Sequence, residues 1–280
     1  LYTQDFNGLS NNAGGSYGMT GFGRGPYYLS TPSANATNLT GWQHMSIGGT
    51  GTDLTFGVDN GTSSSGATKS YGATGSTNRA LGSLATGTTV PAFGAVFVNN
   101  TGGPLTSVTI NYTGQQWRNG GSGGLNQLVF AYQIGSADIN SGVFTTESSL
   151  TFTNPVSGGT AINLDGTLPA NQTALSATFN LNTNWLPGQT LVLRWSDNND
   201  AGNDEGLAID DFTLAAQGPT TPLAQDSLVS FLNVLTTSMD VIWTNGDATS
   251  RIVKINTVNA FTDPIDGNDY TANSVYSGSG

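Results

Sequence analysis

Acidic side chains are concentrated around residues 197–211, where carboxylates lie close enough in sequence to bind a cation together. Six of the 18 acidic residues lie within positions 197–211: Asp197, Asp200, Asp204, Glu205, Asp210 and Asp211. Carboxylates at this density repel one another unless water, a cation or arginine neutralises them. The run 197–204 also supplies amide oxygens and a glycine for a tight bend, which is the donor chemistry of Ca²⁺ sites. We therefore predict Asp197, Asn199, Asp200 and Asp204 as ligands of a structural calcium ion.

The spacing within this run excludes an EF-hand loop. Asp197, Asn199 and Gly202 match the start of such a loop. However, Ala201 stands at its third ligand position, and Ala208 stands where the bidentate glutamate is required. An irregular calcium site remains open.

The alternative for the same run is a solvated turn whose acids pair with arginine. Lysine and arginine together number only seven, so an arginine beside a predicted strand indicates a specific structural or binding role. We expect Arg79, Arg118 and Arg194 to be structural partners of carboxylates, because arginine binds a carboxylate through two parallel hydrogen bonds.

The chain lacks the residue types that several kinds of catalysis require. The chain has no Cys and a single His, which excludes thiol nucleophiles and zinc sites built on Cys or several His. A Ser-His-Asp triad would have to use His44, which we expect to be an exposed or hydrogen-bonded loop residue. Glu147 and Glu205 are the only glutamates and show no cleft signature of a glycosidase. Asp210 and Asp211 are adjacent on a predicted strand and so point to opposite faces. The sequence predicts no enzyme.

Aromatic residues in the predicted loops are open to two interpretations. They could stack on sugar rings, or they could fill the core and the ends of the fold, which is the more common use of such residues. The residues concerned are Tyr17, Phe22, Tyr27, Tyr28, Trp42, Tyr71 and Trp117.

The elements that must position these groups are β-strands, because apolar and polar residues alternate throughout. In 106–113, Val108, Ile110 and Tyr112 share one face, and the intervening polar residues share the other. Nine such segments are predicted as strands: 2–6, 54–58, 93–98, 106–113, 127–134, 148–153, 175–182, 190–196 and 207–214. Gly-rich stretches at 11–25, 57–78 and 119–124 are predicted loops. This pattern predicts an all-β, jelly-roll-type antiparallel β-sandwich over residues 1–216.

A second domain is expected after a short linker that contains two prolines, residues 217–223. Beyond it, 224–280 carries three further apolar segments, near 228–234, 239–243 and 251–255. About 58 residues are too few for a sandwich domain of roughly 100 residues. We therefore expect the sequence to stop inside a domain.

Two families are similar to these regions. The segments SMDVIWTNGD (238–247) and SRIVKI (250–255) resemble the first half of a fibronectin type III repeat, in which Trp243 would be the buried tryptophan of the second strand. Residues 1–216 resemble jelly-roll modules of secreted multidomain proteins of the Bacteroidetes type, including cleaved-adhesin, MAM-like and carbohydrate-binding modules. The matching segments are DFN (5–7), NRALG (78–82), YTGQQWR (112–118), LRWSD (193–197) and GLAIDDF (206–212).

The second resemblance adds a further ion-binding candidate. In similar jelly rolls a structural Ca²⁺ joins acids of the first and last strands, which implies Asp5 together with Asp210 or Asp211 as ligands.

Composition and resemblance together indicate an extracellular protein. The net charge is −11, and seven scattered basic residues cannot form the positive surface that nucleic acid requires. No stretch is long and apolar enough for a membrane-spanning helix, and residues 1–6 fit a mature N-terminus after removal of a signal peptide. The expected localisation is secreted or cell-surface.

We expect a non-catalytic module for adhesion, assembly or substrate attachment, with surface proteins or glycans as partners. The alternatives are an accessory domain of a secreted hydrolase and a subunit of a polymeric surface fibre.

Overall fold

The computed structural model describes residues 1–12, 16–18, 23–30, 36–219, 224–248, 251–256, 258, 260–265 and 270–271, with only the backbone at 16–18. The chain divides into two compact units, Leu1–Gln217 and Gly218–Gly280. Part of the predicted linker, 220–223, lies outside the described residues. Within the described part of the chain, no helix is long and apolar enough to cross a membrane.

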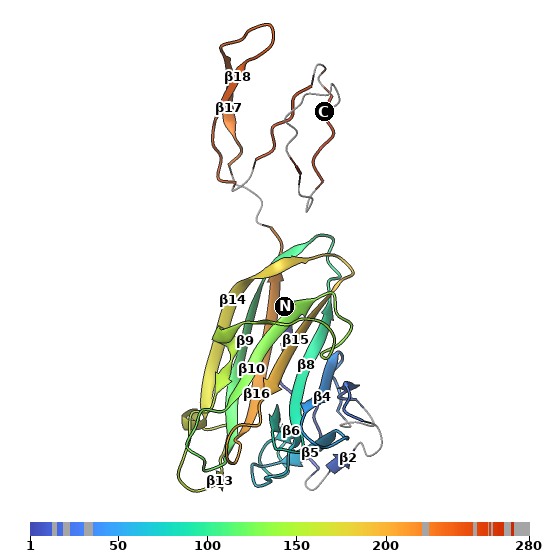
Figure 1. The fold of residues 1–280 in the computed structure, drawn as a ribbon, viewed down its shortest axis with the longest axis vertical. Helices are drawn as coiled ribbons and strands as arrows, with labels where there is room; N and C mark the ends of the chain where they lie inside the picture. Colours follow the sequence, from blue (N-terminus) through green and yellow to red (C-terminus); the bar gives the residue numbers. More distant parts are fainter. Residues whose placement is uncertain are drawn as a thin grey trace. The chain divides into compact units, whose positions relative to one another are not determined.

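The first unit is built from two β-sheets that lie face to face (Figure 1). In sheet A the described strands follow the order β13-β9-β16-β7-β6-β5-β2, with β1 on β16 and β14 on β9. Their bounds are β1 Tyr2–Gln4, β2 Ser16–Gly18, β5 Thr55–Asp59, β6 Ala67–Tyr71, β7 Ala80–Leu84, β9 Leu105–Asn119, β13 Ile162–Asn163, β14 Gln172–Trp185 and β16 Gly206–Gln217. In sheet B the order is β11-β10-β15-β8-β4-β3, with β12 on β10. Its bounds are β3 Tyr27–Tyr28, β4 Trp42–Gly48, β8 Val90–Val98, β10 Gln127–Ile134, β11 Thr145–Thr146, β12 Phe152–Thr153 and β15 Thr190–Asp197.

The chain crosses between the sheets repeatedly, as a jelly roll does. From β8 onward the long strands β8, β9, β10, β14, β15 and β16 fall alternately in sheets B and A. Pairing is antiparallel except between β5 and β6, where Phe56 to Asp59 run parallel to Thr68 to Tyr71. The predicted fold class, an all-β antiparallel sandwich of jelly-roll type, is confirmed for this unit.

Aromatic rings fill the space between the sheets. Trp42 and Trp195 stack with centroids 6.0 Å apart, and Phe93 also stacks with Trp195 at 6.0 Å. Phe212 from sheet A meets both tryptophans edge-on, at 5.5 and 5.7 Å. All four side chains are fully buried. Alternation along each strand directs one row of large side chains inward, and these rows make one continuous core.

The strands that were not predicted are those without simple alternation. β4, β6 and β7 are buried at most or all positions, so neither face shows a polar row. β6 falls within 57–78, and β2 within 11–25, so neither stretch is wholly a loop. Segment 148–153 was predicted as one strand, but it forms a 3₁₀ turn at Ser148–Leu150 followed by the short β12.

The second unit contains one described hairpin, β17 Ser227–Leu232 and β18 Asp240–Thr244. The predicted segment 251–255 is described and is not a strand. Trp243, expected to be buried, is 36% exposed, and Leu228 and Phe231 are exposed more widely. Residues 272–280, the end of the predicted domain 224–280, lie outside the described residues.

Candidate functional site

The first group of predicted ion ligands lies where the first and last strands of the unit pair. β1 runs antiparallel to β16, with Gln4 opposite Phe212, so Asp5 lies near Asp210 and Asp211. Asp210 is buried and accepts hydrogen bonds from Gln115 Nε2 at 3.1 Å and from the Asp211 amide at 2.8 Å. Burial, followed by the charges of Asp211 and Asp5, raises the pKa of Asp210 to about 7.

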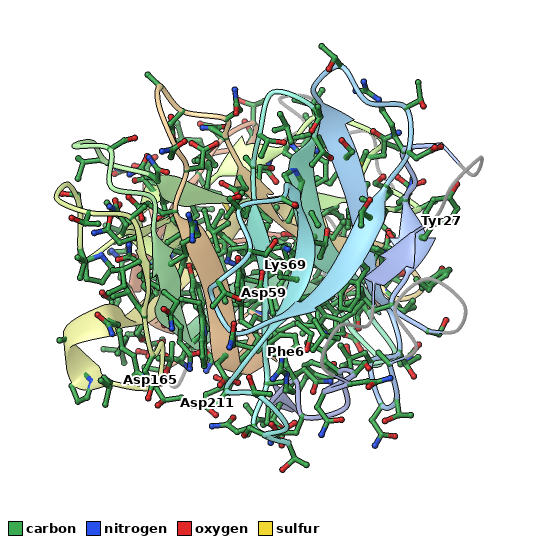
Figure 2. All side chains as sticks on the ribbon, turned by 90° about the horizontal axis from the view of Figure 1, so that it is seen from below. Phe6, Tyr27, Asp59, Lys69, Asp165 and Asp211 are labelled. Atoms are coloured by element: carbon green, nitrogen blue, oxygen red, sulfur yellow. The ribbon has the colours of Figure 1, made fainter. Side chains whose placement is uncertain are left out.

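Asp5 and Asp211 line a shallow hollow of about 410 Å³ beside this strand pair. Two residues that line it have a positive φ, Asp211 at 50° and Asn38 at 58°, as does the buried Phe6 that follows Asp5, at 53°. Such angles are uncommon for residues other than glycine and gather at functional sites. Figure 2 labels Phe6 and Asp211. The Asp5 carboxylate accepts two hydrogen bonds from its neighbour Asn7, so it is oriented by its own turn.

The second group lies at the end of β15 and in the loop that leads to β16. Asp197 is buried and accepts a hydrogen bond from Ser83 Oγ at 2.8 Å, and the Asp200 amide donates to Asp204 Oδ1 at 2.9 Å. Burial and the neighbouring carboxylates raise the pKa of Asp197 well above its ordinary value, and burial raises that of Asp204 to about 6. Asn199 lines a hollow of about 230 Å³ together with Asp204.

Glu205, which was not among the predicted ligands, is buried in this loop and is held by two hydrogen bonds. Its Oε2 accepts from the Gly120 amide at 2.6 Å and from Gln116 Nε2 at 2.9 Å, whereas its buried Oε1 has no hydrogen-bond partner. Burial raises the pKa of Glu205.

The structure thus brings the predicted acids together in two separate groups. Among the described residues, no three His, Cys, Asp or Glu side chains are arranged to hold a metal ion. Calcium takes about six to eight oxygen ligands. An ion at either group would therefore need main-chain and amide oxygens for most of its shell.

The arginines have structural roles, but not the predicted ones. Arg118 donates to the carbonyl oxygens of Gly61 and Thr62, and Arg194 lies 3.7 Å above the Phe144 ring. Within the described ranges, the ion pairs are Lys69–Asp59 and Arg251–Asp226. The expectation that Arg79, Arg118 and Arg194 pair with carboxylates is therefore wrong, because main-chain oxygens and a ring take that place.

His44 also differs from expectation. It lies in β4 and is fully buried, and neither ring nitrogen has a hydrogen-bond partner. Its ring meets Phe56 edge-on at 5.6 Å. Burial lowers the pKa of His44 to about 3. Its apolar surroundings therefore keep the imidazole neutral at ordinary pH.

Of the five aromatic candidates whose side chains are described, three are core residues. Trp42 and Tyr71 are fully buried, and Trp117 stacks on Tyr71 at 6.1 Å. Tyr28 is 57% exposed and Tyr27 is half-buried. Phe22 and the side chain of Tyr17 lie outside the described residues.

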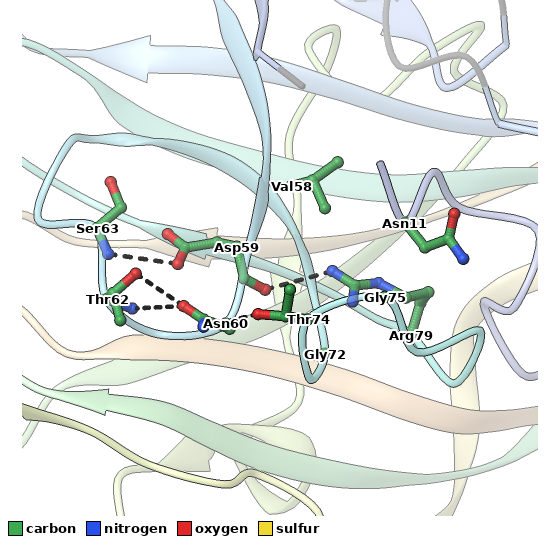
Figure 3. Close-up of a pocket in the computed structure, with 10 residues that line it drawn as sticks. All are labelled: Asn11, Val58, Asp59, Asn60, Thr62, Ser63, Gly72, Thr74, Gly75 and Arg79. Atoms are coloured by element: carbon green, nitrogen blue, oxygen red, sulfur yellow. Dashed lines mark hydrogen bonds between the residues drawn. The ribbon is translucent and has the colours of Figure 1, made fainter. Parts of the chain in front are cut away.

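A polar pocket of about 300 Å³ lies at the end of β5 and β6, and we name it the Asp59 pocket (Figure 3). Its lining residues are Asn11, Val58, Asp59, Asn60, Thr62, Ser63, Gly72, Thr74, Gly75 and Arg79. Asp59 ends β5, and its Oδ1 accepts from the amides of Gly61 and Ser63 at 2.9 and 3.3 Å, which shapes the loop that follows. Its Oδ2 lies 3.1 Å from Lys69 Nζ, with both side chains at most 5% exposed.

Uncharged groups make up most of the pocket wall. Asn60 donates to Thr74 Oγ1 at 3.1 Å and accepts from Thr62 Oγ1 at 2.7 Å, which joins the two loops (Figure 3). Arg79, only 1% exposed, donates to Ser70 Oγ and to carbonyl oxygens on both sides of the pocket. The loops are thus tied to the sheet by buried charged groups.

None of the ten lining residues was among the predicted ligands. Of these residues, Arg79 alone was singled out in the sequence, as an expected partner of a carboxylate and as part of the NRALG segment at 78–82. The ion pair joins adjacent parallel strands that the sequence pattern did not reveal. Two signals were available: both Lys69 and Arg79 are scarce cations, and each lies beside or within a Ser/Thr/Gly-rich segment.

No protein-family profile and no curated protein matches this chain. Among solved structures, it is similar to TmCBM61 in complex with β-1,4-galactotriose, at 9% identity and a TM-score of 0.26 over 51% of this chain and 74% of that one. It is also similar to the CBM22-1 xylan-binding domain from Paenibacillus barcinonensis, at 10% identity and a TM-score of 0.28 over 56% and 83% of the two chains. A third is the enzymatically active domain of bacteriophage CBA120 tailspike protein 4, at 13% identity and a TM-score of 0.30 over 75% and 21%. Functional inference therefore rests on this chain's own residues.

Proposed function

We propose that the first unit is a non-catalytic, extracellular attachment module that holds a glycan in the Asp59 pocket. The observation that carries this proposal is the wall of uncharged hydroxyl and amide side chains. These residues are Asn11, Asn60, Thr62, Ser63 and Thr74. Sugar hydroxyls both donate and accept hydrogen bonds, and hydroxyl and amide groups offer both functions. A few placed polar groups on a rigid scaffold are the usual basis of ligand selection.

Binding fits this pocket better than catalysis. Of the described residues that line it, Asp59 and Arg79 are the ionisable ones. The Asp59 carboxylate is already held by two amides and by Lys69. Acid–base catalysis needs a group that can exchange a proton with the substrate, and here the carboxylate instead holds a loop in place.

Adhesion, substrate attachment and service as the accessory domain of a secreted hydrolase would all use this same binding activity. Assembly into a surface fibre is a different proposal, favoured by the exposed apolar side chains of the second unit, among them Leu228, Phe231 and Val234. A chain that stays monomeric at high concentration in analytical ultracentrifugation would remove the fibre alternative.

A structural calcium ion is part of the leading proposal, with the acids of the two groups described above as its carboxylate ligands. Thermal unfolding with and without chelator tests it. When the free Ca²⁺ concentration is about 100 times the dissociation constant, binding stabilises the fold by roughly 2.7 kcal/mol. The melting temperature should therefore fall in EDTA and recover with Ca²⁺. An unchanged melting curve would remove the ion.

The pocket itself is tested by affinity electrophoresis against a panel of soluble plant and microbial polysaccharides. Asn60→Ala combined with Thr74→Val removes the hydrogen bond between the two loops and two sugar-facing groups. We expect retardation by the bound polysaccharide to weaken about tenfold. Asn180→Ala with Thr178→Val, at exposed positions of β14, is the matched control and should bind as the parent does. Equal binding by both double variants would refute the pocket.

A further inference from the structure

The guanidinium of Arg79 carries one more donor than the protein uses. Nε donates to Ser70 Oγ at 2.9 Å, and Nη2 donates to the carbonyl oxygens of Asp59 and Ser70. Nη1 donates to the Ala73 carbonyl at 3.2 Å. A guanidinium has five N–H groups, so among the described residues one hydrogen of Nη1 has no acceptor. Arg79 lines the Asp59 pocket, and Figure 3 shows its guanidinium beside Asp59 and Thr74.

The charge of Arg79 also lacks a direct counter-ion. No carboxylate of the described residues forms an ion pair with it, because Asp59 is paired with Lys69 instead. Asp59, Lys69 and Arg79 together carry one net positive charge, in a chain whose net charge is −11. A buried cation is stabilised most by an anion that also accepts its hydrogen bond.

The backbone is shaped so that Nη1 can lie at this wall. A Cβ atom on Gly72 would come 2.4 Å from Nη1 and 2.7 Å from the central guanidinium carbon. A side chain at position 72 would therefore displace the guanidinium. The absence of a side chain at Gly72 lets Nη1 reach the wall of the pocket.

We propose that the Asp59 pocket selects a sugar that carries a carboxylate, and that one carboxylate oxygen accepts the fifth N–H of Arg79. The hydroxyl and amide wall then bonds the ring hydroxyls. A volume of about 300 Å³ is near the lower limit for ligand pockets, so the pocket holds one sugar residue of a uronic-acid-containing glycan. This inference rests on the proposed function and narrows its ligand class.

The experiment compares ligands that differ only in the carboxylate. Galacturonate, its methyl ester, galactose and acetate are titrated into the full chain by isothermal calorimetry or by chemical-shift mapping. A charge-assisted hydrogen bond predicts that galacturonate binds about tenfold to a hundredfold more tightly than the ester or galactose. Acetate should bind more weakly than galacturonate, because it lacks the ring hydroxyls.

The outcomes separate this inference from the proposed function. Equal binding of galacturonate, the ester and galactose would overturn the carboxylate selection but leave a glycan pocket. Acetate binding as tightly as galacturonate would show a carboxylate site without sugar selection and would also overturn the inference. Failure of all the sugars, and of uronic-acid and neutral polysaccharides alike, would remove the proposed function itself.

Variants locate the effect. Arg79→Lys removes the planar fork and should reduce the preference for galacturonate over its ester to about threefold or less. Arg24→Lys is the matched control, since Arg24 also donates to carbonyl oxygens but lies outside this pocket, and its preference should be unchanged. Should Arg79→Lys not fold, the ester comparison on the parent chain still decides the inference. A folded Arg79→Lys variant with the full preference would overturn it.

Discussion

Two regions of the first unit bury carboxylates in opposite ways. At the Asp59 pocket the acid is matched by Lys69 at 3.1 Å within the same sheet (Figure 2). At the pairing of β1 with β16, Asp210 is equally buried but meets only neutral donors and two further acids, Asp5 and Asp211. The pKa of Asp210 consequently rises to about 7.

The difference shows what scarce basic residues do in this chain. Of the five buried carboxylates among the described residues, only Asp59 forms an ion pair with a cationic side chain. An unpaired buried carboxylate is neutralised by a proton or by an external cation. The Asp59 pocket is therefore stabilised by an internal ion pair, whereas the charge of Asp210 at the β1–β16 site changes with the pH of the medium.

The largest expected effect comes from breaking the internal pair. Lys69→Met leaves Asp59 buried beside a neutral side chain, and removal of one partner from a buried pair costs about 3–5 kcal/mol. Urea unfolding followed by tryptophan fluorescence measures this, since Trp42, Trp117, Trp185 and Trp195 all lie in the first unit.

Two controls sharpen this result. Lys254→Met changes the only other lysine, which is half-buried in the second unit, and should leave the unfolding transition of the first unit unchanged. Lys69→Met combined with Asp59→Asn removes both charges and should recover most of the lost stability. If Lys69→Met alone costs under about 1 kcal/mol, the value of an exposed pair, the pair does not organise the pocket.

A smaller effect is expected at Asp210, where stability depends on pH because this buried carboxylate has no cationic partner. Its folded pKa of about 7 lies above the ordinary 3.8, so the folded state holds the proton more tightly than the unfolded chain. The stabilising contribution is fully present below pH 3.8 and is lost as the pH rises through 7. Relative to Asp210→Asn, the parent should therefore lose about 2.5 kcal/mol between pH 5 and pH 8 in EDTA.

The same pair of proteins tests the cation. At pH 8 an added Ca²⁺ ion should restore stability to the parent and leave Asp210→Asn unchanged, if Asp210 is a ligand. Parallel stability profiles of the two proteins in EDTA would contradict the raised pKa. Equal stabilisation of both proteins by Ca²⁺ would show that Asp210 is not a ligand of the ion.

The sequence predicted these two regions unequally. The long strands β9 and β14 follow from the sequence because polar and apolar residues alternate along 106–113 and 175–182. The pairing of the first and last strands, which brings Asp5 near Asp210, came from the family resemblance. β6 was missed because Lys69 and Ser70 are buried in it, and their partners, Asp59 and Arg79, lie on other segments.

The pocket could not be predicted for a related reason. Its walls come from Asn11, the loop after β5 and the loop after β6, which the parallel pairing of β5 with β6 brings together. Local alternation contains no record of a parallel pair. The Gly-rich composition of 57–78 therefore suggested only loop where the structure has a buried strand.

The smallest expected change in stability comes from His44, a buried base whose charged form is a cation and not an anion. Its folded pKa of about 3 lies below the ordinary 6.5, so the unfolded chain binds the proton more readily. Stability that is present above pH 6.5 is then lost as the pH falls toward 3, by about 2 kcal/mol between pH 7 and pH 5. His44→Phe keeps an aromatic ring against Phe56 and removes the titration. The variant should therefore gain about that amount over the parent at pH 5 relative to pH 7, measured by urea unfolding at both values. A difference between parent and variant that does not change with pH would mean that the imidazole is hydrated or hydrogen-bonded in solution, and that the β4 face of the core is not closed to water.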